Sequence, residues 1–188
     1  STITEDYLSE KWPLVEFEEN IMINAAYFPS SALIDQVMNL KKNEAIFDGE
    51  DIVAFYAEED QEVDFEVFKQ LEIAGEVLKL AHTWNIFSKN DFAINFDFKL
   101  ITEDRESEPI NSSNFVKNPE NIFIEEGAVV ENCSLNASTG PIYIGKDALV
   151  MEGCFFRGPI AIGEEAVVKM GAKIYGATTI GPGSRAGG

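Results

Sequence analysis

The side chains of this sequence that could do chemistry are few. Lys169 and Lys173 could offer positive charge to an anionic ligand, although solvated surface lysines fit the same pattern at least as well. The only histidine, His82, could accept a proton near pH 7. It follows an expected helix, where packing or capping is the plainer interpretation. We therefore identify no catalytic residue and no metal ligand within this span.

Large apolar residues recur every six positions over the last third of the sequence. Small residues predominate four positions after them, and glycine follows the apolar position at Gly145, Gly163 and Gly181. Six residues predict one flat face and one corner, so that three faces close a coil that stacks on the next at about 4.8 Å. We expect the large residue to fill the interior, the small one to occupy the corner, and glycine to adopt backbone angles closed to other residues. The apolar positions are Ile144, Val150, Phe156, Ile162, Val168, Ile174 and Ile180.

The same register extends toward the N-terminus with one interruption. Asn136 takes a slot that should be apolar, and Ile144 then comes two residues late. We predict a two-residue bulge or loop near residues 138–140. The pattern still runs at Gly188, so we expect the chain to be a central fragment whose β-helix continues beyond it.

Composition restricts the function classes. The chain has 188 residues and a formal net charge of −19; residues 1–117 contain 25 acidic and 9 basic side chains, and residues 118–188 contain 8 and 5. An acidic surface repels phosphate backbones, so we expect no nucleic acid partner.

No apolar run approaches the roughly 20 residues of a membrane span, and no signal peptide is visible. Cys133 and Cys154 are the only cysteines; they fall in different repeat slots, so we expect free thiols, no disulfide, and a cytoplasmic protein.

The acidic first part is predicted to mix α and β structure. We divide the chain into an α/β region at 1–108, a linker at 109–117 and a parallel β-helix at 118–188. Within the first region, apolar spacing and turn residues predict helices at 4–12, 32–41 and 65–81, strands at 20–27, 45–47, 52–56 and 91–101, and a short link at 82–89.

Several stretches resemble one enzyme family. They are Leu-Ser-Glu-Lys-Trp-Pro from Leu8, Ile-Asn-Ala-Ala-Tyr-Phe-Pro from Ile23, Thr-Trp-Asn-Ile-Phe from Thr83, and the run from Ile124 to Gly181. An α/β region followed by hexapeptide repeats is similar to the sugar-phosphate nucleotidyltransferases. In particular, it resembles a short variant of the bifunctional enzymes that combine uridyltransferase and glucosamine-1-phosphate acetyltransferase activities. The resemblance implies a left-handed β-helix and a role in nucleotide-sugar synthesis for cell-wall precursors.

The resemblance also implies ligands, partners and departures. The family uses Mg²⁺ and acetyl-coenzyme A, acts on a sugar phosphate and a nucleoside triphosphate, and forms homotrimers. An arginine matching Arg185 contacts the sugar phosphate there, with Lys169 and Lys173 as further candidates, although Arg185 also fits a solvent-facing position. This sequence lacks the Gly-rich phosphate loop, has Ala25 and Ala26 where a metal-binding aspartate is expected, and has no histidine in its repeats.

These departures leave alternatives open. We expect this span alone to be inactive. A non-catalytic protein is the main alternative, with the β-helix as a trimerising scaffold and the acidic region binding a partner. A zinc enzyme of the β-helical carbonic anhydrase kind would need several histidines on adjacent coils, and residues 118–188 contain none.

Overall fold

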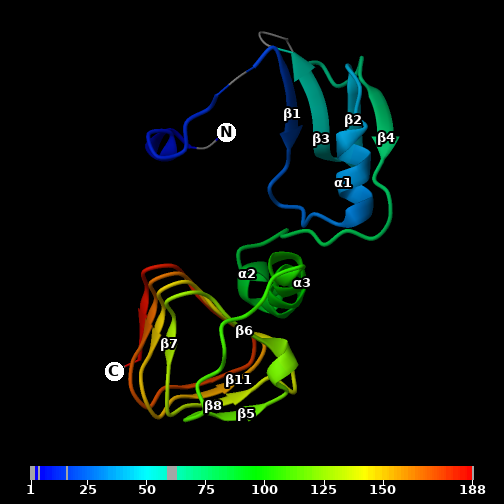
Figure 1. Ribbon diagram of the computed structural model, residues 1–188. Helices are drawn as coiled ribbons and strands as arrows, with labels where there is room; N and C mark the ends of the chain where they lie inside the picture. The colour runs from blue at the N-terminus through cyan, green and yellow to red at the C-terminus, as the bar shows by residue number, and fades with distance from the viewer. Residues whose placement is uncertain (1–2, 4, 16, 59–62, 188) are drawn as a thin grey trace. The chain divides into compact units, whose positions relative to one another are not determined.

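The computed structural model describes residues 3, 5–15, 17–58 and 63–187 of the protein. The chain forms two compact units, Ser1–Ala81 and His82–Gly188, which are described in turn (Figure 1). Over the described residues, no helix has the length and apolar character that crossing a lipid bilayer requires.

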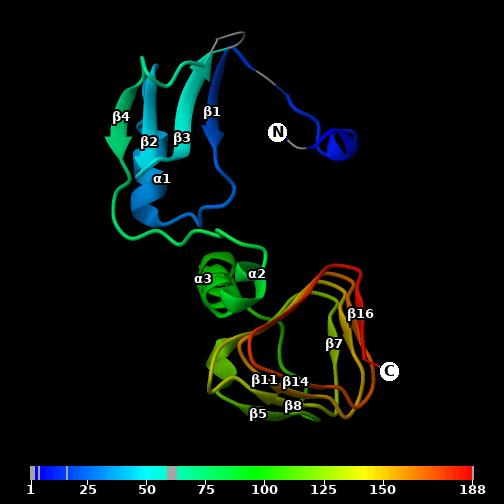
Figure 2. The same ribbon diagram turned by 180° about the vertical axis from the view of Figure 1, so that it is seen from behind.

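A four-stranded sheet with one helix forms the first unit. The strand order is β1-β3-β2-β4, in which β3 pairs antiparallel with β1 and β2, and β4 pairs parallel with β2. The helix α1 lies against this sheet (Figure 2). Its residues Leu33 and Val37 belong to the same buried cluster as Ile46 and Ala54 of the sheet. The elements are η1 (Asp6–Leu8), β1 (Glu19–Ile23), α1 (Ser31–Met38), β2 (Glu44–Asp48), β3 (Asp51–Glu58) and β4 (Lys69–Glu72).

Most of the elements predicted for this unit are present. The strand pair at 45–47 and 52–56 is confirmed as β2 and β3, and the helix at 32–41 is confirmed as the shorter α1. Ser30 caps α1 by accepting a hydrogen bond from the Leu33 N–H at 3.2 Å. The strand predicted at 20–27 ends at Ile23. Of the helix predicted at 4–12, Asp6–Leu8 forms one 3₁₀ turn, and Thr4 lies outside the described residues.

The helix predicted at 65–81 is wrong. Lys69–Glu72 form β4 beside β2, and Gly75 has a φ of +77°, which a right-handed helix cannot contain. Two of the apolar residues that have helical spacing in this segment pack against Phe55 instead. The Phe65 and Phe68 rings lie 5.1 and 6.2 Å from the ring of Phe55, which they meet edge-on.

The strand predicted at 91–101 is also wrong, because Asn90–Thr102 form the helix α3. The alternation of apolar residues there contains a second pattern. Ile94, Phe98 and Ile101 are four and three residues apart, so a helix gathers them on one face, and they line a groove against the β-helix. Asn90 fixes the start of α3 to the β-helix through hydrogen bonds with the Ala177 carbonyl and the Thr179 hydroxyl. The expected link at 82–89 contains the short helix α2 (Asn85–Ser88).

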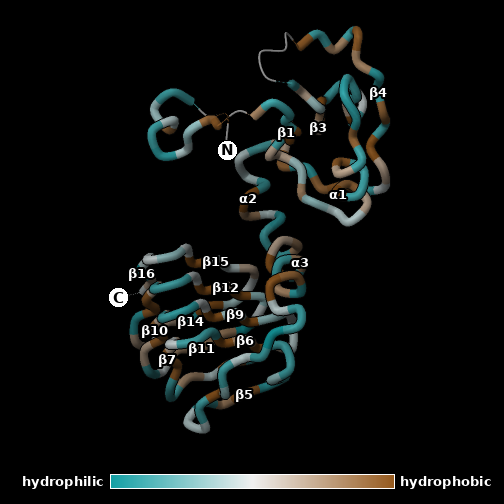
Figure 3. The backbone as a smooth tube through the Cα atoms, turned by 45° about the horizontal axis from the view of Figure 1, so that its top comes forward, coloured by the Kyte–Doolittle hydropathy of each residue, from teal (hydrophilic) through white to brown (hydrophobic). Residues whose placement is uncertain are grey.

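A parallel β-helix makes up most of the second unit. Its strands form three sheets of four, with orders β14-β11-β8-β5, β15-β12-β9-β6 and β16-β13-β10-β7, so the chain completes four coils. Figure 3 shows these coils stacked on one another. The strands, coil by coil, are β5 (Phe115–Lys117), β6 (Ile122–Ile124) and β7 (Val129–Val130); β8 (Ser134–Asn136), β9 (Ile142–Ile144) and β10 (Leu149–Val150); β11 (Phe155–Arg157), β12 (Ile160–Ile162) and β13 (Val167–Val168); and β14 (Lys173–Tyr175), β15 (Thr178–Ile180) and β16 (Arg185–Ala186).

The interior of the β-helix confirms the hexapeptide prediction. Six of the seven predicted large residues are buried, and Ile174 packs against the same core from a partly exposed position in the last coil. The small corner residues Ala148, Cys154 and Ala166 are fully buried. The six buried large residues are Ile144, Val150, Phe156, Ile162, Val168 and Ile180.

The reason predicted for the repeating glycines is wrong. Gly145, Gly163 and Gly181 do not have positive φ angles. Their repetition has a packing cause instead. A Cβ at Gly145 would lie 2.7 Å from the Glu164 nitrogen, in the backbone of the next coil. The positive φ angles fall two residues later, at Asp147, Glu165 and Gly183.

The interruption near Asn136 consists of two changes rather than one bulge. The corner before β8 spans 131–133, one residue fewer than the corner 151–154 before β11. The following corner spans 137–141, where the next coils have 158–159 and 176–177. The first change moves Leu135, which is fully buried, into the interior slot and turns Asn136 outward. The second change restores the register before Ile144.

The same shortened corner places the two cysteines in equivalent positions, contrary to the predicted difference of slot. Cys133 precedes β8 and Cys154 precedes β11, and Ser134 pairs with Phe155 across these strands. Both thiols are buried and free. Each thiol donates a hydrogen bond to a carbonyl of the following coil, Cys133 to Met151 at 3.3 Å and Cys154 to Lys169 at 3.3 Å.

The β-helix begins within the residues predicted as a linker. Phe115–Lys117 form β5, which pairs with β8. Ahead of it, Asn114 accepts a hydrogen bond from the Cys133 N–H at 2.8 Å and donates one to the Val130 carbonyl at 2.8 Å. Ile110 packs against the interior core. These contacts attach the segment before β5 to the first coil.

An ion-pair network joins the segment after α3 to the outer face of β6 and β9. Arg105 bonds to Glu125 at 2.6 Å, and the Tyr143 hydroxyl donates to the same carboxylate at 2.7 Å. Burial by itself would raise the pKa of Glu125, but the hydrogen bonds from Arg105 and Tyr143 outweigh it and lower the pKa below its usual value. Burial, together with the adjacent carboxylate, raises the pKa of Tyr143 to about 12.

We expect Glu125→Gln to remove an acid-dependent part of the stability. Because the folded-state pKa of Glu125 is lowered, its contribution is complete above the ordinary value of 4.5 and is lost as pH falls below it. The variant should melt a few degrees below the wild type at neutral pH, and the difference should shrink as the solution is acidified. Thermal melts across this range test it, with the exposed neighbour replaced in Glu126→Gln as control. An unchanged gap in acid would contradict it.

Candidate functional site

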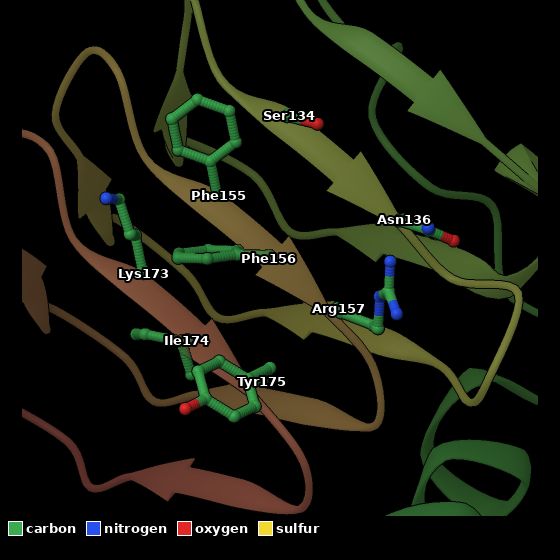
Figure 4. Close-up of a pocket in the computed structure, with 8 residues that line it drawn as sticks. All are labelled: Ser134, Asn136, Phe155, Phe156, Arg157, Lys173, Ile174 and Tyr175. Atoms are coloured by element: carbon green, nitrogen blue, oxygen red, sulfur yellow. The ribbon is translucent and has the colours of Figure 1, made fainter.

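Two columns of outward side chains run across the sheet β14-β11-β8-β5. The parallel register aligns Phe115, Ser134, Phe155 and Lys173 in one column, and Lys117, Asn136, Arg157 and Tyr175 in the other. The central residue of each strand points inward, so the residues on either side of it point out. A groove of about 660 Å³ lies over β8, β11 and β14 on this face. Figure 4 shows the side chains that line it.

The charge of this face differs from that of the chain. Its eight outward residues include Lys117, Arg157 and Lys173 but no acidic residue, although the chain has 33 acids and 14 bases. Across residues 3, 5–15, 17–58 and 63–187, no ion pair or side-chain hydrogen bond engages Arg157 or Lys173. Both cations are exposed. The groove therefore offers unpaired positive charge on an acidic protein.

Aromatic rings alternate with these cations. Phe155 pairs in register with Lys173, and Arg157 pairs with Tyr175, so each cation neighbours a ring on the adjoining strand. Phe155 is 55% and Tyr175 is 78% exposed, values that leave the ring faces accessible. Ser134 and Asn136 add a hydroxyl and an amide at the next strand. Such a face can hold an anion, stack a flat ring and hydrogen-bond to hydroxyl groups.

The three predicted binding residues lie in different parts of the β-helix. Lys173 lines the groove. Arg185 begins β16 and pairs with Val167, which puts it on the sheet β16-β13-β10-β7. Lys169 lies at the corner between β13 and β14, where its N–H donates to the Ala186 carbonyl at 2.9 Å. The β-helix therefore brings Lys173 together with Arg157 and does not place Arg185 on the same face.

Sequence reasoning missed Arg157 and the two rings, although a signal was present. The interior slots Phe156 and Ile174 were recognised, and the residues on either side of such a slot must point outward. Phe155 and Lys173 precede these slots, while Arg157 and Tyr175 follow them. Combining the period of eighteen with the outward positions would have selected all four.

In the first unit, the segment after β1 is where the resemblance implies a metal-binding aspartate. Ala25 and Ala26 carry no ligand atom, and Asn24 is occupied, since its amide donates to the Ile52 carbonyl and accepts from the Ala26 N–H. Nowhere in the described part of the chain do three or more His, Cys, Asp or Glu side chains gather as a metal would require. The described residues therefore do not fit Mg²⁺, which prefers carboxylate oxygens.

A polar cluster lies beside that position. The hydroxyl of the buried Tyr27 donates to Asp48 at 3.1 Å, and Lys79 forms an ion pair with Asp51. The ammonium group of Lys79 also lies over the Tyr27 ring. Burial raises the pKa of Tyr27, and the bond to Asp51 raises the pKa of Lys79. Both carboxylates are thus engaged within the protein, which is the pattern of a structural network.

His82 is exposed, and its ring stacks on the Trp84 ring with centroids 4.2 Å apart. Its backbone N–H donates to the Asn85 side chain at 2.9 Å.

Comparison with known proteins adds one finding. A family model described as sugar nucleotidyl transferase matches residues 1–106. Neither the curated proteins nor the solved structures contain a match.

Proposed function

Because the chain belongs to the sugar nucleotidyl transferase family, we propose that the full-length protein containing it makes a nucleotide sugar from a sugar 1-phosphate and a nucleoside triphosphate. We propose further that the β-helix acetylates an amino-sugar phosphate at the expense of acetyl-coenzyme A. The observation that carries this proposal is the layout: the family match ends at residue 106, and the hexapeptide β-helix follows in the same chain.

The binding residues in this proposal are cations on the β-helix. Lys169, Lys173 and Arg185 are exposed and would neutralise a sugar phosphate, with Arg185 able to make paired hydrogen bonds to it. They do not share one face of a single β-helix. We therefore propose a homotrimer in which neighbouring copies bring these faces together. No step is assigned to Mg²⁺, which the described residues of the acidic unit do not fit.

A non-catalytic scaffold is the second candidate. It is favoured by Ala25 and Ala26 at the expected metal position and by the absence of histidine from residues 118–188. In that case the β-helix would be a trimerising support, and the acidic unit would bind a partner.

The test uses the full-length natural chain that contains this sequence. It is supplied with glucosamine 1-phosphate and acetyl-coenzyme A while free thiol is measured, and with a sugar 1-phosphate and UTP or dTTP while pyrophosphate is measured. We expect both products, and we expect the 188-residue chain alone to form neither. Pyrophosphate without thiol would remove the acetyltransferase part. If neither product forms with any sugar phosphate tried, the non-catalytic scaffold replaces the proposed enzyme function.

Lys146→Ala serves as the control for the binding residues, because Lys146 is an exposed cation at a different corner. Arg185→Ala should raise KM for the sugar phosphate about tenfold or more, as expected from losing a charged phosphate contact. Lys146→Ala should leave KM unchanged. Equal KM values in the two variants would count against Arg185 as a binding residue.

A further inference from the structure

The groove over β8, β11 and β14 has the features of a site for a specific class of ligand. Arg157 and Lys173 point outward from neighbouring coils, in adjacent columns. Diagonal neighbours on adjacent strands lie about 7–8 Å apart, a separation that long side chains span, so both cations can reach one phosphate or two linked phosphates. No described side chain compensates their charge. Two exposed, unpaired cations on an acidic chain can attract an anion from solution.

The rings restrict the class of anion. Phe155 and Tyr175 lie diagonally across the two columns from each other, each beside a cation (Figure 4). Inorganic phosphate would leave both rings unused and exposed. A ligand that joins a flat heterocycle to phosphates would use a ring and the cations together, because heterocyclic bases stack on aromatic side chains. The amide of Asn136 and the hydroxyl of Ser134 lie within the same groove and suit the hydroxyls of a ribose.

We propose that this groove binds a nucleoside phosphate, with Arg157 and Lys173 holding its phosphates and Phe155 or Tyr175 stacking on its base. This inference rests on the proposed function, since both a nucleoside triphosphate and coenzyme A carry this chemical group. A long nucleic acid is not the ligand, because a net charge of −19 repels a polyanion beyond the few phosphates that the groove can neutralise.

The experiment measures binding rather than activity. Calorimetric titration of the full-length chain with ATP, UTP, coenzyme A, pantetheine and pyrophosphate separates the parts of the ligand. We expect nucleoside phosphates to bind, pantetheine to fail, and pyrophosphate to bind more weakly. Tighter binding of coenzyme A would identify it as the source of the group, and tighter binding of ATP or UTP would identify a nucleoside triphosphate.

The variants assign the contacts. Arg157→Ala and Lys173→Ala should each weaken nucleotide binding about tenfold or more, while Lys146→Ala should not. Tyr175→Ala and Phe155→Ala, taken together, should weaken nucleotide binding but leave pyrophosphate binding unchanged. Lys173→Glu provides a second variant at an exposed position, where folding should be retained. Circular dichroism and melting temperature check the fold of each.

Two outcomes would overturn the proposal. One is nucleotide binding that is unaffected by all the groove variants. The other is a change in oligomer size by light scattering without a change in nucleotide affinity, which would make this face a contact between copies. Whether the groove binds nucleotide is measured separately from whether the protein forms product. Binding at the groove with neither product formed would leave the inference standing and remove the proposed function, whereas product formation with wild-type binding in every variant would do the reverse.

Discussion

Replacing Gly163 with alanine should unfold the β-helix or lower its stability severely. The added Cβ would lie 2.6 Å from the Pro182 nitrogen and 2.9 Å from the Gly181 carbonyl carbon. Both are backbone atoms, and the coils cannot separate to make room because the Gly163 N–H donates to the Ile180 carbonyl at 2.8 Å. Overpacking costs about 1–3 kcal/mol in well-packed cores, and we expect at least the upper part of that range here. Urea unfolding followed by circular dichroism measures it.

In the 188-residue chain, Gly181→Ala is the matched control for this prediction. Gly181 occupies the same repeat position one coil later, but a Cβ there would meet only the Ser184 hydroxyl at 3.6 Å, an ordinary contact. The control should therefore unfold near the wild-type urea concentration. Gly145→Ala should behave like Gly163→Ala, since its Cβ would also meet the backbone of the next coil. If the control were as unstable as Gly163→Ala, local backbone freedom rather than contact between coils would explain these glycines.

The β-helix could be predicted from the sequence because each coil repeats the same local requirement. Every interior slot needs a large apolar residue, and every tight corner needs a small one, so Val150 and Ala166 are recognisable without knowledge of the rest of the fold. Handedness does not follow from the spacing and comes only from the resemblance. The corner lengths around Leu135 could not be predicted either. The corner before β8 is shorter and the corner after it is longer, so the spacing of the apolar residues reveals only the net change.

The residues before the β-helix were harder to predict because tertiary contacts override their local patterns. The alternating residues of 91–101 satisfy a strand and a helix equally, and the choice depends on whether Ile94 and Phe98 meet a partner surface, which α3 finds on the β-helix. Likewise, Phe65 and Phe68 have helical spacing but pack around Phe55 from an extended segment. The partner surface of α3 lies far away in the sequence, and the contacts of Phe65 and Phe68 with Phe55 form only once β3 and the following segment are folded together.

The groove was predicted only in part for a similar reason. Lys173 was selected for its charge alone, whereas Arg157 becomes a candidate only when the coils are stacked and the two cations face the same solvent. Tyr175 carries no chemical signature of a site by itself. Its position in the register next to Arg157 makes it one, and that register follows from the regular eighteen-residue spacing between β11 and β14.

The last prediction compares Leu135→Ala with Asn136→Ala. It tests which of these two residues occupies the interior slot of the second coil. Leu135 is fully buried among interior residues, so its truncation should cost about 2–5 kcal/mol. Asn136 points outward, and its side chain accepts hydrogen bonds from the Ser138 N–H at 3.0 Å and hydroxyl at 2.6 Å. Losing these should cost only about 0.5–1.5 kcal/mol. Chemical unfolding of both variants gives the comparison, and a larger loss at Asn136 would mean that the repeat continues through this coil without the shortened corner.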